Sequence, residues 1–559
     1  MIVVATAGCR RGDEGPVVCD EFVEVPDPAL RELLVALLPA PAAGESDTDT
    51  TGGEATGGAD TEGAEAPISS EALAALTGLR AVDAGIKDLR GLECAHGLET
   101  IGLASNEIKD LGPLSRLPAL REIEVSDNPI PSIKALAGVT TLEKIVIART
   151  MVDDLGPIDG LPALRHLDAA GAKIRSLRPL RHLLTLETLV LSGNAIDDLG
   201  PLEDLDQLFA LQVDANAIGD VEALAGLGSL EYLDLDRNKI GSLAPLAGLK
   251  ALRDLEATDN AIADSMGIGD KPELLELDLG GNMLGELGGL TGMPKLVRLV
   301  VDDNALDSLA GIEGLTALRT LGAQNNGLTS LAPLVGLTAL RRVDLEGNPG
   351  IVDLSPLSGL VELEFLDLGG GARTLDLGPL TALPLIRQLE LEEVAPADFA
   401  VFAMMPGLET LNLSDSAAVT EAQLPTLATA TGLRTLLLDG TAIADPSALA
   451  PLTLLTRLEL ARTQVSALAP FGAWTSMSSL DLEATPLASL AGVETIKGIA
   501  SLDVSETAIA DLEPLVAVAG FRNGDTLDAR GTLLDVGDCP AIQALTDRGA
   551  VVNHDVQCE

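Results

Sequence analysis

One pattern of apolar and polar positions recurs along most of the chain. In its second occurrence apolar residues stand at Ile101, Leu103 and Ile108, and Asn106 stands between the last two. We call the position of Asn106 the marker. At an unbroken spacing of 22 residues the marker is occupied by Ala84, Asn106, Asn128, Thr150, Ala172, Asn194, Asn216, Asn238, Asn260, Asn282, Asn304, Asn326 and Asn348. Chance does not produce such a series, so the pattern indicates a repeat protein.

The repeats continue less regularly after Asn348. Markers at spacings of 22, 23 or 25 residues follow at Gly371, Val394, Ser416, Thr441, Thr463, Thr485, Thr507 and Thr532, which makes about 21 repeats. No linker interrupts residues 70–535, and only 2% of the residues are aromatic. A single stack explains both observations, because each repeat packs only against its neighbours and supplies Leu, Ile and Val to a narrow core.

Each repeat is predicted to consist of a strand and a return. Residues 233–235, Leu-Asp-Leu, alternate apolar and polar side chains as a short strand does, and neighbouring strands would form one parallel sheet. In residues 198–205, Pro201 stands where a short helix or 3₁₀ turn would begin. The predicted fold class is an α/β repeat, a curved solenoid with the sheet on its concave face, short helical returns on its convex face and a cap at each end.

The marker side chain is predicted to be structural. Asparagine carries both a donor and an acceptor, so stacked asparagines can bond the backbone groups that the bend leaves unpaired. From Thr441 onward the marker is threonine five times in succession. A hydroxyl can replace only part of the amide bonding, so we expect a weaker ladder there.

Four parts follow from this organisation. They are an N-terminal segment 1–23, a helical cap 24–83 with an acidic insert 41–66, the solenoid 84–535 and a C-terminal cap 536–559. Asp27 and Pro28 form a helix start, and a second short helix is expected near Ser70. An apolar stripe of the first helix would consist of Leu30, Leu33, Leu34, Leu37 and Leu38. The insert has seven acids and no basic residue, so we expect it to be disordered.

The five cysteines lie almost entirely outside the repeats. A disulfide between Cys539 and Cys558 would staple the C-terminal cap, and one between Cys19 and Cys94 would fasten the first cap, which leaves Cys9 alone. This distribution predicts an oxidising, extracytoplasmic compartment. The alternative is free, reduced thiols in a cytosolic protein.

Cys9 has a context of its own. Residues 5–9, Ala-Thr-Ala-Gly-Cys, resemble the site at which bacterial lipoprotein signal peptides are cut and the cysteine is lipidated. Thr6 stands where leucine is usual, and only eight residues precede the cysteine, which a start codon assigned too late would explain. The sequence has no stretch of 18 apolar residues, so any membrane attachment is expected through lipid rather than through a span.

The repeat resembles a known family. Residues 183–202 and 227–246 are similar to the internalin-type leucine-rich repeats of bacterial surface proteins. The resemblance covers about residues 70–535 and implies protein recognition on the concave sheet face. Neither an immunoglobulin-like module nor a cell-wall sorting tail follows the repeats, so host-cell adhesion is not implied.

Acidic residues dominate the solvent-facing position between the two strand leucines. The acids are Glu124, Asp168, Asp234, Glu256, Asp278, Asp344, Asp367, Glu390, Glu459, Asp481, Asp503 and Asp528, and only Arg80 is basic. Because parallel strands lie about 4.8 Å apart, consecutive acids such as Asp234, Glu256 and Asp278 would repel one another. A basic protein ligand or bound cations would relieve that repulsion. Asp168, Asp234, Glu256, Asp278, Asp344 and Asp367 are the candidate ligand-binding residues. Alternatively, the acids only keep a chain of net charge −49 in solution.

No pattern in the sequence indicates catalysis. The four histidines fall at unrelated positions of the repeat, and no nucleophile elbow, phosphate-binding loop or metalloprotease motif occurs, so we expect no enzyme, no cofactor and no metal site. A uniformly negative surface excludes nucleic acid. The leading hypothesis is a monomeric, extracytoplasmic protein-binding solenoid. An intracellular scaffold or enzyme regulator and a structural envelope component are the alternatives.

Overall fold

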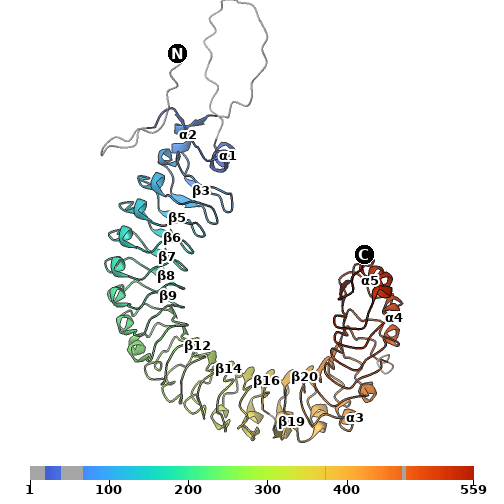
Figure 1. The fold of residues 1–559 in the computed structure, drawn as a ribbon. Helices are drawn as coiled ribbons and strands as arrows, with labels where there is room; N and C mark the ends of the chain where they lie inside the picture. The colour runs from blue at the N-terminus through green and yellow to red at the C-terminus, as the bar shows by residue number, and fades with distance from the viewer. Residues whose placement is uncertain (1–18, 39–66, 372, 469–473, 559) are drawn as a thin grey trace, which may run out of the picture. The chain divides into compact units, whose positions relative to one another are not determined.

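The computed structural model describes residues 19–38, 67–371, 373–468 and 474–558. Cys9 and the predicted insert 41–66 lie outside these residues. The chain divides into two compact units, Met1–Ala261 and Ile262–Glu559. Each unit is a stack of repeats with strands along the inner side of its curve and 3₁₀ helices (labelled η) along the outer side (Figure 1).

The first unit contains one parallel sheet. Its strands are β3 (Gly78–Arg80), β4 (Thr100–Gly102), β5 (Glu122–Glu124), β6 (Lys144–Val146), β7 (His166–Asp168), β8 (Thr188–Val190), β9 (Ala210–Gln212), β10 (Tyr232–Asp234) and β11 (Asp254–Glu256). The buried middle residues align across the sheet, so that Leu233 pairs with Leu211 on one side and Leu255 on the other. Because side chains alternate along a strand, burial of the middle residue turns both of its neighbours to the opposite face.

The returns of the first unit are single 3₁₀ turns. They are η1 (Leu92–Cys94), η2 (Gly112–Leu114), η3 (Lys134–Leu136), η4 (Gly156–Ile158), η5 (Arg178–Leu180), η6 (Gly200–Leu202), η7 (Glu222–Leu224) and η8 (Ala244–Gly248). Pro201 lies in the first turn of η6, as predicted, and Leu202 at its end is fully buried. Proline suits this place because its fixed φ matches the turn and the N–H it lacks would have no partner there.

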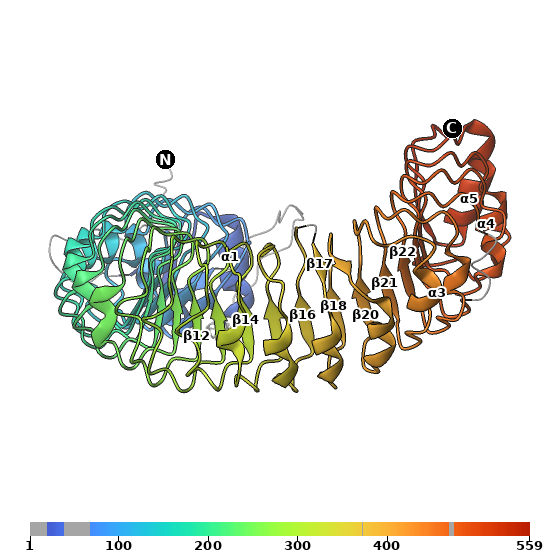
Figure 2. The same ribbon diagram turned by 90° about the horizontal axis from the view of Figure 1, so that it is seen from below.

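The second unit repeats the same arrangement with a longer sheet (Figure 2). Its parallel strands are β12 (Glu276–Asp278), β13 (Arg298–Val300), β14 (Thr320–Gly322), β15 (Arg342–Asp344), β16 (Phe365–Asp367), β18 (Gln388–Glu390), β20 (Thr410–Asn412), β21 (Thr435–Leu437), β22 (Arg457–Glu459), β23 (Ser479–Asp481), β24 (Ser501–Asp503), β25 (Thr526–Asp528) and β26 (Val551–Asn553). The returns include η9 (Ala332–Leu334), η10 (Ser355–Gly359), η11 (Gly378–Ala382), α3 (Leu424–Leu427), η13 (Pro446–Leu449), η15 (Val493–Thr495), α4 (Glu513–Val516) and η16 (Val536–Asp538). The final helix is α5 (Cys539–Asp547).

One stretch of the second unit departs from the pattern. Here β17 (Thr374–Leu375) and β19 (Ala395–Pro396) form a separate two-stranded parallel sheet, followed by η12 (Phe399–Met404). Phe399 and Phe402 of this helix are buried and pack edge to face, with ring centroids 6.0 Å apart. The large side chains fill the core where the repeat is longer.

Asp27 bonds the N-terminal cap to the first repeat. The cap contains β1 (Phe22–Val23), α1 (Pro28–Leu37), β2 (Ile68–Ser69) and α2 (Ser70–Ala74). Asp27 precedes α1, and its Oδ1 accepts a hydrogen bond from the Leu30 N–H at 3.0 Å. Its Oδ2 accepts from the Lys87 N–H at 2.8 Å and the Asp88 N–H at 3.1 Å. These bonds lower the pKa of Asp27 although burial raises it.

The predicted apolar stripe of α1 is only partly buried. Leu30 and Leu34 are buried, Leu33 and Leu38 are half-buried, and Leu37 is 50% exposed. The side of α1 that carries Leu30 and Leu34 is therefore the one packed against the rest of the unit.

Both predicted disulfides are present. Cys19 joins Cys94 at the end of η1, and Cys539 at the start of α5 joins Cys558 after β26. The sheet also extends into both predicted caps, since β3 lies within 24–83 and β26 within 536–559.

Asparagine markers bond two repeats at once. In Asn128, which is 2% exposed, Oδ1 accepts from the Ile108 N–H of the preceding repeat at 2.9 Å. Its Nδ2 donates to the carbonyls of Leu103 in the preceding repeat at 2.8 Å and of Val125 and Ser126 in its own at 3.1 Å. The same four contacts recur at Asn106, Asn194, Asn216, Asn238, Asn260, Asn304, Asn326 and Asn348.

Threonine markers bond only their own repeat. The Oγ1 of Thr463, which is 1% exposed, donates to the Leu460 carbonyl at 2.6 Å. The Thr463 N–H donates to the same carbonyl at 3.3 Å and closes the turn. Thr441, Thr485, Thr507 and Thr532 also donate through Oγ1 to the carbonyl three residues earlier.

Candidate binding surface on the sheet face

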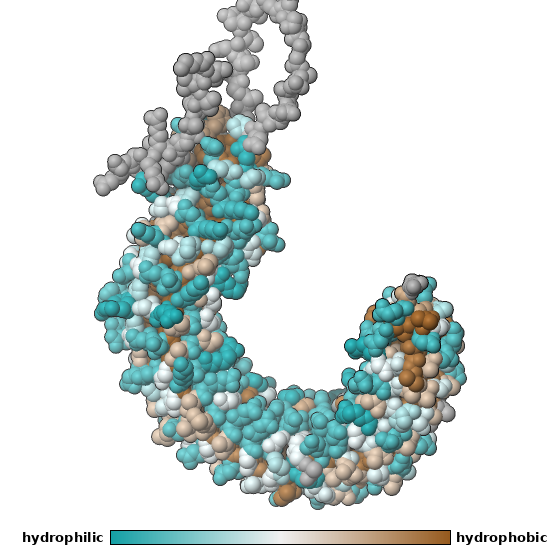
Figure 3. All heavy atoms as spheres, in the orientation of Figure 1, coloured by the Kyte–Doolittle hydropathy of each residue, from teal (hydrophilic) through white to brown (hydrophobic). Residues whose placement is uncertain are grey.

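The six candidate ligand-binding acids all end a strand on the sheet face. Asp168, Asp234 and Glu256 end β7, β10 and β11 of the first unit, and Asp278, Asp344 and Asp367 end β12, β15 and β16 of the second. Much of the inner side of each unit is hydrophilic (Figure 3).

The sheet register brings some of these acids together and separates others. Asp234 pairs with Glu256, and Asp344 pairs with Asp367. Asp168, in contrast, lies between Val146 and Val190, and Asp278 lies beside Val300. The acids therefore form local columns of like charge, which are interrupted where a neighbouring strand ends in valine. Glu459, Asp481, Asp503 and Asp528 form another such column on consecutive strands.

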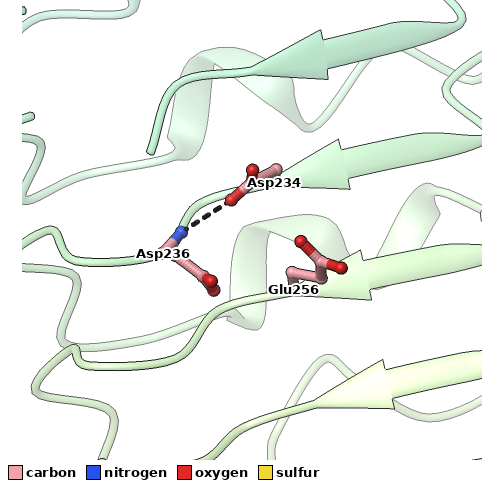
Figure 4. Close-up of side chains that lie close together, drawn as sticks. All are labelled: Asp234, Asp236 and Glu256. Carbon is pink, nitrogen blue, oxygen red and sulfur yellow. Dashed lines mark hydrogen bonds between the residues drawn. The ribbon is translucent and has the colours of Figure 1, made fainter. Parts of the chain in front are cut away.

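Each pair is completed by an acid that the sequence analysis missed. Asp236 lies with Asp234 and Glu256, and each contributes a carboxylate oxygen to a group whose members are all within 4.8 Å of one another (Figure 4). Glu346 completes an equivalent group with Asp344 and Asp367. The sequence did contain a signal for Asp236 and Glu346, because each stands two positions after a candidate acid and residues two positions apart in an extended chain face the same side.

The aspartates of this surface also have a local structural role. Asp234 Oδ1 accepts a hydrogen bond from the Asp236 N–H at 3.1 Å, and Asp367 Oδ1 accepts from the Gly369 N–H at 2.8 Å. Asp236 Oδ1 accepts from the Thr258 N–H of the next repeat at 2.6 Å. An asparagine could make the same bonds, so they do not explain why the residue is charged.

Burial and neighbouring charges raise the pKa of several of these carboxyl groups. Burial raises the pKa of Asp234 to about 7, and the negative charges of Asp214, Asp236 and Glu256 add to the effect. Burial, together with Asp344, Glu346 and Glu390, also raises the pKa of Asp367 to about 7. These carboxylates are thus held in places where the negative charge is disfavoured.

Arginines compensate part of the charge in the second unit, so the sheet face is less uniformly acidic than predicted. Arg298 lies 3.4 Å from Asp278, and Arg342 lies 3.4 Å from Asp344. The Arg342 guanidinium also stacks on Phe365, 3.5 Å from the ring centroid. Both arginines stand at the start of a strand, β13 and β15, and the sequence analysis counted only the strand ends.

Each acidic group could contribute to holding a cation. Carboxylate oxygens suit a hard ion such as Ca²⁺, which takes six to eight oxygen ligands. Three carboxylates are close enough in each group to supply some of them.

No helix in the described parts of the chain is both long and apolar enough to cross a bilayer.

A family model described as leucine-rich repeats in two copies matches residues 316–359. The chain has the fold of a leucine-rich-repeat protein. No curated protein matches the sequence of this leucine-rich-repeat protein.

Solved structures of other leucine-rich-repeat proteins are similar to it. A plant peptide hormone receptor in complex with RGF2 is 16% identical over 86% of this chain and 89% of that chain, with a TM-score of 0.58. An internalin of Listeria monocytogenes is 22% identical over 78% and 95% of the two chains, with a TM-score of 0.40. A leucine-rich-repeat protein of Leptospira interrogans is 18% identical over 87% and 97%, with a TM-score of 0.42. At these identities the likeness concerns the fold, and the predicted leucine-rich-repeat solenoid is confirmed.

Proposed function

We propose that this leucine-rich-repeat protein works outside the cytoplasm and recognises a basic protein ligand through the acidic sheet face of its repeats. The observation that carries the proposal is the grouping of carboxylates on adjacent strands, Asp234 with Asp236 and Glu256, and Asp344 with Glu346 and Asp367. Leucine-rich-repeat solenoids are binding scaffolds, and nothing in the site indicates catalysis.

The physical argument is that a ligand's positive charge relieves an unfavourable arrangement. The carboxylate oxygens lie within 4.8 Å of one another, so their charges repel, and Asp234 is only 8% exposed. A lysine or arginine placed between Asp234 and Glu256 would interact with both at once. Such complementary charge also increases the association rate, and the gain falls with ionic strength.

The two disulfides support an extracytoplasmic location. Cys19–Cys94 and Cys539–Cys558 join parts of the chain that are 75 and 19 residues apart. Disulfides persist in oxidising compartments and are rare in the cytosol. Lipid attachment at Cys9 belongs to the same proposal. Intact-mass analysis of protein extracted from membranes tests it, because an unmodified Met1 or a mature chain without Cys9 excludes the modification.

The binding proposal is tested by removing charge without removing hydrogen-bond acceptors. The full chain and the triple variant Asp234→Asn, Asp236→Asn, Glu256→Gln are immobilised and exposed to envelope, secreted and cytosolic fractions of the source cells. Bound proteins are eluted with rising salt and identified. We expect a basic protein that the variant binds about tenfold or more weakly and with a smaller salt dependence.

The matched control removes three carboxylates elsewhere. Glu203, Asp204 and Asp206 are exposed on the return that follows η6 and belong to neither acidic group. The triple variant Glu203→Gln, Asp204→Asn, Asp206→Asn should bind as the wild type does. If both triple variants behave alike, net charge rather than the sheet face governs binding and the proposal is wrong.

A further inference from the structure

A depression lies on the sheet face at the beginning of the first unit, away from both acidic groups. Its volume is about 490 Å³, and it extends over β3, β4 and β5 to Lys144 at the start of β6. The exposed Leu37 of α1 lines it as well. This volume lies in the range of pockets that bind small molecules.

Glycine creates the depression. Gly102 occupies the position between Arg80 on β3 and Glu124 on β5, where β6 and β8 carry Val146 and Val190. A Cβ added to Gly102 would lie 3.6 Å from Arg80 Cγ and 3.7 Å from Glu124 Oε2. The two charged side chains thus flank Gly102, at a strand position that valine occupies in β6 and β8.

The charged groups that line the depression do not form ion pairs with one another. They are Arg80 and Lys144, which are cationic, and Glu122 and Glu124, which are anionic. Among the residues that the structure describes, none of these four side chains forms an ion pair or a side-chain hydrogen bond. Glu122 and Lys144 remain apart although they are register partners on β5 and β6.

A second depression shows the contrasting arrangement. It is lined by Arg387 and Glu409, among other residues, and these two form an ion pair at 3.0 Å. These two charges neutralise each other, and the remaining charged residue of the lining is the cation Arg434. In the first depression both signs of charge remain available, with the cation Arg80 and the anion Glu124 on opposite sides of Gly102.

We propose that the depression over β3 to β6 binds a peptide-sized molecule that carries a carboxylate and an ammonium or guanidinium group. The carboxylate meets Arg80, and the cationic group meets Glu122 and Glu124. Because Arg80 and Glu124 are two strands apart, their Cα atoms are separated by about 10 Å. Their side chains reach inward, and a C-terminal lysine with a free carboxylate spans the remaining gap. The aliphatic part of the ligand contacts Leu37. This site is separate from the acidic groups, and the proposal does not depend on the function proposed for them.

The probe is the peptide acetyl-Ala-Ala-Lys with a free C-terminal carboxylate, titrated into the full chain by calorimetry. We expect saturable binding at a single site. The C-terminal amide and the analogue with norleucine in place of lysine should each bind about tenfold or more weakly, because each lacks one charged partner. A carboxylate and a cationic group in this arrangement can come from a free short peptide or from the C-terminus of a protein. The same tripeptide attached to the C-terminus of a small inert protein distinguishes these two sources. Binding in that form shows that chain ends of proteins are accepted, and binding of the free peptide alone restricts the site to short peptides.

Gly102→Val is the decisive variant. It places in β4 the residue that β6 and β8 already carry, and the nearest atoms are side-chain atoms at ordinary contact distance, so the fold should be retained. We expect loss of peptide affinity by about tenfold or more, and Arg80→Gln should act in the same direction. Arg387→Gln at the second depression and the Asp234, Asp236, Glu256 triple variant should leave peptide binding unchanged. Absence of binding to the wild-type chain, or an affinity that Gly102→Val does not alter, overturns the proposal.

Discussion

The repeats marked by asparagine and those marked by threonine hold the same kind of sheet together in different ways. Asn128 contacts Ile108 and Leu103 in the preceding repeat as well as its own turn. Thr463 contacts only Leu460 in its own repeat. The asparagine ladder thus adds side-chain hydrogen bonds between repeats, whereas the threonine ladder only stabilises each turn.

This difference follows from the chemistry of the two side chains. An amide carries an acceptor and two donors, pointing in different directions, so one asparagine can reach two repeats. A hydroxyl carries one donor on a short stem and reaches only its own turn. In the threonine repeats, cohesion between neighbours relies more on the sheet and on buried side chains such as Leu458, which pairs with Leu436 and Leu480.

The largest effect is expected for Asn128→Ala. The substitution removes four contacts and leaves buried backbone groups of two repeats without partners. It should lower the free energy of unfolding of the surrounding repeats by about 3 kcal/mol, measured by urea unfolding. The Ile108 amide should also exchange its hydrogen faster. Asn523→Ala, at an exposed asparagine, is the control and should change neither quantity.

A smaller loss of free energy of unfolding is expected for Asn128→Thr, which places a threonine marker in a repeat that has asparagine. The hydroxyl can keep a bond to the Val125 carbonyl but cannot reach the Ile108 N–H of the preceding repeat. We expect a destabilisation of about 2 kcal/mol and an Ile108 amide that exchanges as fast as in Asn128→Ala. An Ile108 amide that stays protected would show that the asparagine is not what links the two repeats.

A still smaller loss is expected for Thr463→Val, which removes the hydroxyl and keeps the shape of the side chain. Only the bond to the Leu460 carbonyl is lost, and the Thr463 N–H still donates to that oxygen. Urea unfolding should show a decrease of about 1 kcal/mol, compared with no change for Thr453→Val at an exposed position. A loss as large as that of Asn128→Ala would mean that the two ladders are equivalent.

The last comparison concerns pH, and here the two regions should respond alike. Burial raises the pKa of Asp234 to about 7 and that of Asp481 to about 6, from 3.8. Between the unfolded and folded values the native state binds more protons. Each raised pKa therefore makes a favourable contribution to the free energy of unfolding that is complete below pH 3.8. This contribution is lost as pH rises to about 7 for Asp234 and about 6 for Asp481.

The two substitutions Asp234→Asn and Asp481→Asn should weaken this pH dependence. Each variant should gain stability relative to the wild type at pH 8 and not at pH 4, as measured by thermal unfolding across that range. Asparagine retains an acceptor for the Asp236 N–H or the Glu483 N–H, so the local hydrogen bond is not the cause of the change. A variant that is destabilised equally at both values would show that the carboxylate has a different role.

Most of the repeat architecture could be predicted because it depends on local periodicity. The spacing of the markers, the alternation at Leu233 and Leu235 and the position of Pro201 are enough to place strands and 3₁₀ turns. The cysteine pairs could be predicted for a related reason, since each pair lies at one end of a stack whose order is known.

The candidate site could be predicted only in part. The chain order identifies Asp234 and Glu256 as neighbours on the sheet face, but Asp236 and Arg298 were missed because only one position of each strand was considered. The depression at Gly102 could not be inferred from the repeat, because it depends on the side chains of three strands and on Leu37 of a helix outside the regular pattern.

The sequence by itself determined the fold, because every repeat has the same pattern of apolar and polar residues and packs against a repeat of similar sequence. Only the tertiary structure decided which charges meet. Arg342 lies against Phe365 and Asp344, whereas Arg80 and Glu124 stay apart across Gly102, although all of them lie on strands of a parallel sheet. Periodicity sets the face on which a side chain lies, while its partner depends on the side chains of the neighbouring strands and on the direction each one takes.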